Sequence, residues 1–281
     1  MSRLFHLIFS LLIALSCTAQ QGRVEVLYSP TSILSGVSSR VFSVYLPPSY
    51  DASPSRSYPV LYLLHGGGES HSVWQRHGRL AETLDSLISS SAATEMIVVC
   101  PEANEVNMMY FNAPHWRFED YFFSELIPYV ESHFRALSGR RYRALAGFSM
   151  GGGAAVVYGT HRPALFSMVY DISGYLRRQP LAFLRGDPSA EWRQQVIEDN
   201  NPISRVSSAS PELVDSLRSV DWIIAVGDHD FTLESNMDFV RALRSRRIDY
   251  QFRVSSGVHD WRFVRPNMIE AIKRASRHFN P

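Results

Sequence analysis

The most informative segment of the chain is RALAGFSMGGGAAVVYG, residues 143–159. It begins with a short apolar run, continues through GFSMG at 147–151 and ends in residues that favour a helix. Glycines on both sides of a serine permit a turn so tight that the hydroxyl is pushed outward, which is the geometry of a nucleophile elbow. We therefore predict a strand, a sharp turn and a helix, with Ser149 as a nucleophile. A glycine-rich turn with an incidental serine is the alternative.

Similar apolar runs, each ending at glycine, proline or a polar cluster, recur along the chain. The runs that we predict to be buried strands are 60–64, 96–99, 142–146, 167–172, 222–226 and 248–254. The helix-like segments among them are 80–90, 119–134, 151–160, 212–218, 236–247 and 261–279. This alternation predicts the α/β class, with a mostly parallel central sheet and helices on both faces. Residues 24–27 and 41–46 predict an antiparallel strand pair ahead of it.

A serine hydroxyl needs a base, and His259 is the histidine in the best position. It follows the last predicted strand, and functional side chains gather past the C-terminal ends of parallel strands. The loop after the preceding strand offers two carboxylates, Asp228 and Asp230, to orient that base. Either choice gives the order nucleophile, acid, histidine, which is the order of the α/β-hydrolase fold. The resemblance described below favours Asp230.

Acyl chemistry at a serine also needs hydrogen-bond donors for the oxyanion that forms. The residue after the nucleophile, Met150, would supply one backbone N–H. The segment His65-Gly66-Gly67-Gly68 follows the first predicted central strand, and glycines let the backbone approach a substrate without Cβ clashes. We predict that Gly67 and Met150 form the oxyanion hole. A plain turn between strand and helix is the alternative for the glycine segment.

The composition excludes several other classes of protein. The chain has 281 residues, of which 45% are hydrophobic and 20% charged, with 28 basic against 27 acidic side chains. This balance is ordinary for a folded domain, and the arginines are too scattered for a nucleic-acid footprint. No phosphate-binding lysine follows the glycines at 66–68, and no metal-binding spacing of histidines or cysteines is present. We expect no cofactor and no metal, and we interpret Cys100 as a small buried apolar residue.

The N-terminal residues 1–19 have the pattern of a secretory signal peptide. A basic Arg3 precedes an apolar run at 4–15, and small residues lead to Ala19. The run is too short to span a bilayer, so we expect a secreted or periplasmic protein whose mature chain starts at Gln20. Lipid attachment at Cys17 is the alternative start. We predict that residues 20–281 form a single domain with an insertion near 175–210.

Four motifs together resemble the putative-esterase family of α/β-hydrolases. They are LLHGG at 63–67, GFSMGG at 147–152, GDHDF at 227–231 and GVHDW at 257–261, and the resemblance spans about 41–279. The family includes esterase D (S-formylglutathione hydrolase), feruloyl and acetylxylan esterases of the carbohydrate esterase family 1 type, enterochelin esterases and mycolyltransferases. The resemblance implies a serine carboxylic ester hydrolase acting through an acyl-enzyme, with the acid of its Gly-x-x-Asp motif at Asp230.

Among such relatives, exported members ending in His-Asp-Trp resemble plant-polysaccharide esterases. The resemblance therefore implies acyl esters of carbohydrates, feruloyl or acetyl, as substrates. Trp74, Trp116 and Trp261 would then line a substrate subsite, although each could instead pack in the core. The alternatives are an acyltransferase or a siderophore (enterochelin-type) esterase on the same triad, and a non-catalytic binding protein that keeps the fold. The sequence leaves the oligomeric state open.

Overall fold

The computed structural model of the chain describes residues 20–104, 110–114, 116–176 and 186–280. Within these ranges the main sheet has eight strands in the order β1-β2-β4-β3-β7-β8-β9-β10. The strands are β1 (Arg23–Pro30), β2 (Ser39–Leu46), β3 (Val60–Leu64), β4 (Ile97–Pro101), β7 (Arg143–Phe148), β8 (Met168–Ile172), β9 (Asp221–Gly227) and β10 (Tyr250–Ser255). β1 and β2 pair antiparallel, β2 is antiparallel to β4, and the remaining neighbours are parallel. This arrangement confirms the predicted α/β-hydrolase architecture with its N-terminal antiparallel pair.

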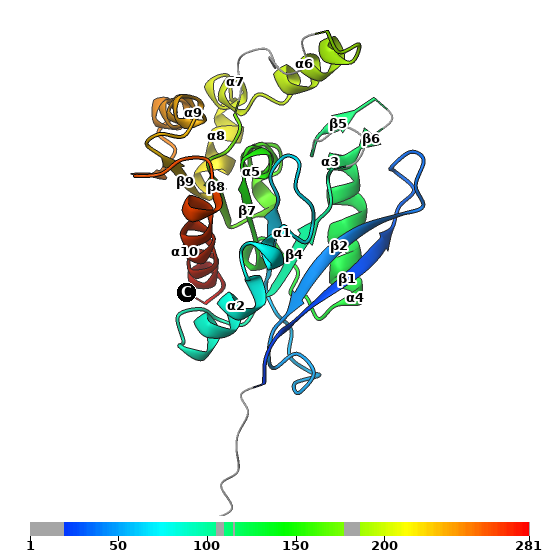
Figure 1. The fold of residues 1–281 in the computed structure, drawn as a ribbon. Helices are drawn as coiled ribbons and strands as arrows, with labels where there is room; N and C mark the ends of the chain where they lie inside the picture. Colours follow the sequence, from blue (N-terminus) through cyan, green and yellow to red (C-terminus); the bar gives the residue numbers. More distant parts are fainter. Residues whose placement is uncertain (1–19, 105–109, 115, 177–185, 281) are drawn as a thin grey trace, which may run out of the picture.

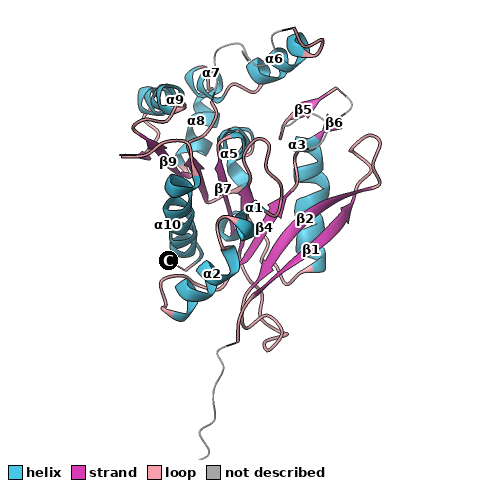
Figure 2. Ribbon diagram, viewed as in Figure 1, coloured by secondary structure: helices cyan, strands magenta, loops and turns pink. Residues whose placement is uncertain are grey.

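Helices cover both faces of the sheet (Figures 1 and 2). One face carries α1 (Val73–Arg76), α2 (Leu80–Ser89) and α10 (Trp261–Phe279). The other face carries α3 (Phe118–Tyr121), the π-helical turn η1 (Phe122–Leu126), α4 (Ile127–His133), α5 (Met150–His161), α7 (Pro202–Ser207), α8 (Pro211–Arg218) and α9 (Leu233–Ser245). The other described elements are the 3₁₀ turns η2 (Arg140–Tyr142) and η3 (Pro163–Leu165), and the β5–β6 hairpin and α6, which are described below.

Alternation along β3 shows why two layers of helices are needed. Val60, Tyr62 and Leu64 pack into the core under α5, whereas Leu61 and Leu63 pack into the core under α2 and α10. Successive side chains of a strand point to opposite faces, so an unbroken apolar run must be covered on both sides. The five residues of β3 are all fully buried, as the continuous run predicts.

The last strand departs from that pattern. The sequence predicts a strand buried on both faces at 248–254, but β10 is half-buried and Val254 is 47% exposed. β10 is the edge of the sheet and pairs only with β9 among the described strands. An apolar run therefore did not distinguish an edge strand from a central one.

The predicted helix at 119–134 forms as one uninterrupted helical run over 118–133, with a π-helical turn inside it. It consists of α3, the π-helical turn η1 and α4, and Pro128 lies in the first turn of α4. Proline has no N–H and its ring clashes with the carbonyl four residues earlier in a regular helix. A π-helical turn directly precedes Pro128 in this run, so the hydrogen-bond pattern ahead of the proline is not that of a regular α-helix.

The segment predicted as an insertion lies partly within the described ranges. Its described part holds α6 (Ala190–Asp199) and the whole of α7. Val196 of α6 packs against Ala113 in the hairpin of β5 (Asn112–Ala113) and β6 (Trp116–Arg117). Figure 1 shows α6 and this hairpin near the same end of the molecule. The predicted signal peptide, residues 1–19, lies outside the described residues. No helix of the described ranges has the length and apolarity to span a membrane.

Candidate active site

Ser149 occupies the turn between β7 and α5. Its φ of 56° and ψ of −116° lie outside the regions that residues with a side chain prefer, and such a conformation costs about 1–3 kcal/mol. Hydrogen bonds hold it there, because its N–H donates to the Ile172 carbonyl at 3.0 Å and its carbonyl accepts from Tyr175 N–H at 2.9 Å. The strained turn places the Ser149 hydroxyl within hydrogen-bond distance of the His259 imidazole.

Glycine is required on both sides of this serine because the backbone crosses itself closely. A Cβ on Gly147 would lie 2.2 Å from the Gly151 carbonyl oxygen, and one on Gly151 would lie 2.4 Å from the Leu64 carbonyl oxygen. Atoms this close to rigid backbone cannot be accommodated without moving β3 or α5. The glycines of the motif are thus explained by packing at the crossing of strand and helix.

His259 lies within hydrogen-bond distance of the serine. Its Nε2 is 2.8 Å from the Ser149 Oγ, although 110 positions separate the two residues. The loop that carries it joins β10 to α10, and Asp260 caps that helix by accepting from the N–H groups of Arg262 and Phe263 at 2.9 and 3.2 Å. The cap fixes the start of α10 directly beside the imidazole.

Asp230 accepts from the other imidazole nitrogen. The His259 Nδ1 lies 2.9 and 3.0 Å from its two carboxylate oxygens. Thr232 donates to the same carboxylate through its N–H at 2.9 Å and its hydroxyl at 2.8 Å. Burial acts to raise the pKa of Asp230, but the hydrogen bonds from His259 and Thr232 outweigh it and lower the pKa to about 2. The carboxylate is therefore ionised across the neutral range.

The other candidate acid, Asp228, has a different position. It is exposed and accepts from the Gly257 N–H at 2.9 Å. In this way it ties the loop after β9 to the loop that carries His259. Of the two carboxylates that the sequence left open, Asp230 contacts the imidazole and Asp228 contacts the backbone.

Two phenylalanines flank the imidazole, and the sequence reasoning did not identify them. The rings of Phe148 and Phe231 lie 4.6 and 4.5 Å from the His259 ring, centroid to centroid. Phe231 remains 63% exposed and also contacts Tyr175. Both phenylalanines are direct neighbours of motif residues, Ser149 and Asp230, so adjacency in sequence was the available signal.

The glycine loop reaches the same edge of the sheet from β3. Leu64 and Gly147 are partners in the parallel ladder of β3 and β7, so residues just past each lie close together. The two strands flank the point where the strand order reverses, which is where ligands bind in open α/β sheets. Among the described residues, neither the Gly67 N–H nor the Met150 N–H donates a hydrogen bond. N–H groups without a described partner at these two positions are what the predicted oxyanion hole requires.

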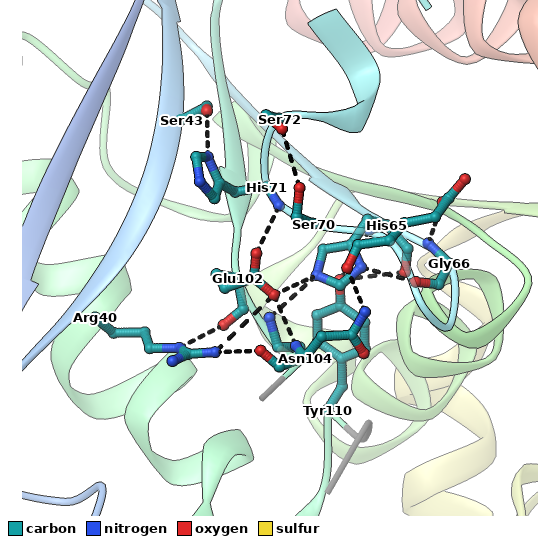
Figure 3. Close-up of polar contacts among 12 residues, drawn as sticks. Arg40, Ser43, His65, Gly66, Ser70, His71, Ser72, Glu102, Asn104 and Tyr110 are labelled. Carbon is teal, nitrogen blue, oxygen red and sulfur yellow. Dashed lines mark hydrogen bonds and ion pairs between the residues drawn. The ribbon is translucent and has the colours of Figure 1, made fainter. Parts of the chain in front are cut away.

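A buried polar network holds this loop against the residues that follow β4 (Figure 3). Glu102 accepts from the His71 and Asn104 N–H groups at 2.9 and 2.8 Å, and Arg40 donates to the Glu102 carbonyl at 2.9 Å. Tyr110 accepts from the His65 N–H at 2.8 Å. Burial acts to raise the pKa of Glu102, but contacts with His65 and the backbone outweigh it and lower the pKa. Figure 3 shows the Glu102 carboxylate between Arg40 and the loop.

The predicted tryptophan subsite is wrong for two of its three members. Trp74 is 0% and Trp116 is 1% exposed, and both pack in the core. Their size and apolar surface are better buried than presented to solvent. Trp261 is half-buried beside the His259 loop and donates its indole N–H to Glu69 at 2.9 Å. An aromatic residue near a motif did not by itself indicate contact with a substrate.

Two further titratable groups lie near the site. Cys100 is buried, and burial raises the pKa of its thiol, which suits an inert core residue. Asp171, at the end of β8, is 0% exposed. Burial and, to a smaller extent, the charge of Asp230 raise the pKa of Asp171 well above its usual range. The described residues contain no group of three or more metal-ligating side chains.

The chain matches proteins of known family. The family described as "Putative esterase" matches residues 37–275. Among solved structures, a ferulic acid esterase has a TM-score of 0.86 and 34% sequence identity, and the match covers 92% of this chain and 99% of that chain.

Curated relatives match over a smaller part of their own length. An endo-1,4-beta-xylanase/feruloyl esterase of Xylanibacter ruminicola is 31% identical over 138 residues, which are 47% of this chain and 19% of that protein. An esterase of Mycobacterium tuberculosis is 27% identical over 256 residues, which are 81% of this chain and 53% of that protein. The chain thus spans about a fifth and about half of the length of these two relatives.

Proposed function

The chain belongs to the "Putative esterase" family, and on this premise we propose that it is a serine carboxylic ester hydrolase that works through an acyl-enzyme. Ser149 is the nucleophile, His259 the general base and Asp230 the acid that orients the base. The observation that carries the proposal is the unbroken chain of contacts from the Ser149 Oγ through both imidazole nitrogens to a buried carboxylate.

The reaction follows from these contacts. The Ser149 Oγ attacks the ester carbonyl while the His259 Nε2 takes the hydroxyl proton, so a tetrahedral oxyanion forms. The N–H groups of Gly67 and Met150 donate to that oxyanion. Nε2 then returns the proton to the leaving alcohol and the acyl-enzyme remains. Water repeats the sequence and releases the acid. Asp230 keeps the Nδ1 proton in place and stabilises the imidazolium.

The first test is removal of the nucleophile. We expect Ser149→Ala to lower kcat for p-nitrophenyl acetate by about 10³-fold or more, because a triad without its nucleophile retains only residual catalysis. Labelling of the folded protein by a fluorophosphonate probe should disappear in the same variant. A variant that hydrolysed the ester at a near wild-type rate would remove Ser149 from its role.

For the substrate, we propose acyl esters of carbohydrates, with feruloyl or acetyl as the acyl group. The support comes from the solved ferulic acid esterase and from a curated feruloyl esterase among the relatives. The exposed ring of Phe231 beside His259 is consistent with an aromatic acyl group. A panel of methyl ferulate, acetylated xylan and a catecholate siderophore tests the class. Added sugar acceptors test for acyl transfer in place of hydrolysis.

For the location, we propose export through the signal sequence at 1–19. Its basic start, apolar run and small residues before Gln20 support the proposal. N-terminal sequencing of the protein from its native host gives the answer, since cleavage by signal peptidase should leave Gln20 first. A lipid-modified Cys17 at the N-terminus would show the alternative, an anchored lipoprotein.

A further inference from the structure

The Glu69 side chain joins two segments that lie far apart in the sequence. Its Oε2 accepts from the Gly66 N–H at 2.9 Å, and its Oε1 accepts from the Trp261 indole N–H at 2.9 Å. Gly66 immediately precedes the proposed oxyanion donor, whereas Trp261 begins α10 just after His259. One carboxylate therefore connects the loop that would hold the oxyanion with the segment that carries the base.

The first contact bears on the direction of the Gly67 N–H. That N–H shares a planar peptide unit with the Gly66 carbonyl, so the two groups point in opposite directions. The Gly66 carbonyl accepts from the Glu69 N–H at 3.3 Å and from the His65 Nδ1 at 2.8 Å. The bond from the Glu69 N–H closes a four-residue turn in which Gly68 has the positive φ, 73°, that a type II turn requires. Glu69 thus holds the turn through both its backbone and its side chain.

The second contact bears on the imidazole. The Trp261 ring lies 5.3 Å from the Trp74 ring and 6.2 Å from the Phe148 ring, both in edge-to-face geometry, centroid to centroid. Phe148 in turn lies against the His259 ring. Because the indole N–H is held by Glu69, the rotation of Trp261 in this aromatic group is fixed. The position of the Phe148 ring, and with it one side of the imidazole, depends on that orientation.

We propose that Glu69 is a positioning residue, which couples the oxyanion turn to the His259 segment so that both are aligned with Ser149. The inference rests on the proposed function and extends it to a residue that lies outside the triad and the oxyanion donors. A misplacement of about 1 Å in a catalytic group can cost about 10²-fold in rate, so a residue of this kind acts on kcat more than on substrate binding.

The test is steady-state kinetics of Glu69→Ala, Glu69→Gln and Trp261→Phe on p-nitrophenyl acetate. We expect Glu69→Ala to lower kcat about 10- to 100-fold with KM changed by less than about three-fold. Glu69→Gln keeps one acceptor oxygen and should fall between Glu69→Ala and the wild type. Trp261→Phe keeps an aromatic side chain but has a smaller ring and no N–H donor, so it should reproduce at least part of the loss.

Two readouts separate positioning from a general loss of structure. Phenylboronic acid adds to the serine as a tetrahedral anion and needs the oxyanion donors, so its inhibition constant should rise in parallel with the loss of kcat. The double variant Glu69→Ala/Trp261→Phe should have about the same kcat as Glu69→Ala. Both changes remove the same hydrogen bond between Glu69 and Trp261, so their effects on kcat should not add. Rate losses that multiply in the double variant would overturn the proposal.

Glu125→Ala is the matched control. Glu125 also accepts from a loop backbone, the Ser32 N–H at 2.8 Å, but it lies on η1 away from the site. It should lower the melting temperature and leave kcat unchanged. A folded Glu69→Ala with wild-type kcat refutes the positioning role alone, provided that Ser149→Ala is inactive. A wild-type protein without esterase activity refutes the proposed function, and the positioning role with it. If Glu69→Ala does not fold, Glu69→Gln and Trp261→Phe decide the matter by the same criteria.

Discussion

Single side chains show how two neighbouring acids acquire different tasks. Asp228 and Asp230 lie in one short loop after β9, yet only Asp230 is buried against the imidazole. The chain turns between them, since the Asp230 N–H donates to the Gly227 carbonyl at 3.1 Å. This turn points Asp230 inward and leaves Asp228 to bind the Gly257 N–H.

Their substitution by asparagine should therefore have unequal effects. We expect Asp230→Asn to lower kcat by about 10⁴-fold, because an amide that faces Nδ1 favours the wrong imidazole tautomer. Asp228→Asn keeps an acceptor for the Gly257 N–H and should change kcat less than about ten-fold. Steady-state kinetics on the same ester measures both variants. Equal losses in the two variants would contradict the assignment of the acid.

Asp171 is a second buried carboxyl group on the sheet edge, and it should affect stability rather than catalysis. Burial raises the pKa of Asp171 above that of the unfolded chain, so the folded protein binds a proton that the unfolded chain releases. Its contribution to stability is complete below the unfolded pKa, near 3.9, and is lost as the pH rises through the folded pKa. For one such proton, the free energy of unfolding changes by at most about 1.4 kcal/mol per pH unit.

We therefore expect Asp171→Asn to gain stability over the wild type as the pH rises from about 4 to 8. At about pH 3 the two proteins should unfold at similar denaturant concentrations, since the wild-type carboxyl is then protonated in the folded state and largely so in the unfolded state. Urea unfolding at several pH values measures the difference. A difference in stability between the two proteins that did not change with pH would contradict the raised pKa of Asp171.

Among the structural elements, the contact of α5 with β3 and β7 shapes the site. α5 begins at Met150 and its first turn lies against the end of β3. Gly159, near its other end, packs against Val169 and Trp222. The helix can lie this close to the sheet only where glycine replaces a side chain.

Gly151→Ala tests this close packing. Its Cβ would meet the Leu64 carbonyl carbon at 2.5 Å, and we expect the free energy of unfolding to fall by about 2–3 kcal/mol with a lower kcat. Gly186→Ala is the control, because its Cβ would meet no atom of the described residues within 4 Å and its φ is 82°. It should cost about 1 kcal/mol and leave kcat unchanged. Circular dichroism melts compare the two variants.

Across the domain, the C-terminal helix is tied to the sheet at a point remote from the site. Asp221, at the start of β9, accepts from the Arg274 Nε at 2.7 Å and from the His278 Nε2 at 2.9 Å, both on α10. Burial acts to raise the pKa of Asp221, but the contacts with His278 and Arg274 outweigh it and lower the pKa. The carboxylate thus stabilises the fold above the unfolded pKa and loses that effect as the pH falls through its folded pKa.

Asp221→Asn should accordingly have the opposite pH signature to Asp171→Asn. At pH 7 we expect it to lower the free energy of unfolding by about 1–3 kcal/mol, the range for hydrogen bonds to a charged group. The difference in free energy of unfolding between this variant and the wild type should shrink as the pH falls below about 4. Urea titrations follow it, and kcat at pH 7 should not change. A gap that widened in acid would show that the carboxylate is not held ionised.

The sequence was sufficient for the order and kind of the main elements and for the turn at Ser149. Short continuous apolar runs indicate strands from local sequence alone, although they do not distinguish the edge strand β10 from a central one. The tight turn requires glycine for steric reasons within a few residues. Both signals are local, so they are readable before the chain folds.

Contacts between distant segments needed the folded molecule. The choice of Asp230 over Asp228, the burial of Trp74 and the bridge from Glu69 to Trp261 depend on which segments pack together, and the last pair is 192 positions apart. Residue type limits what a side chain can do. Which face of it meets solvent, and which partner it meets, is decided by the packing of the sheet and helices around it.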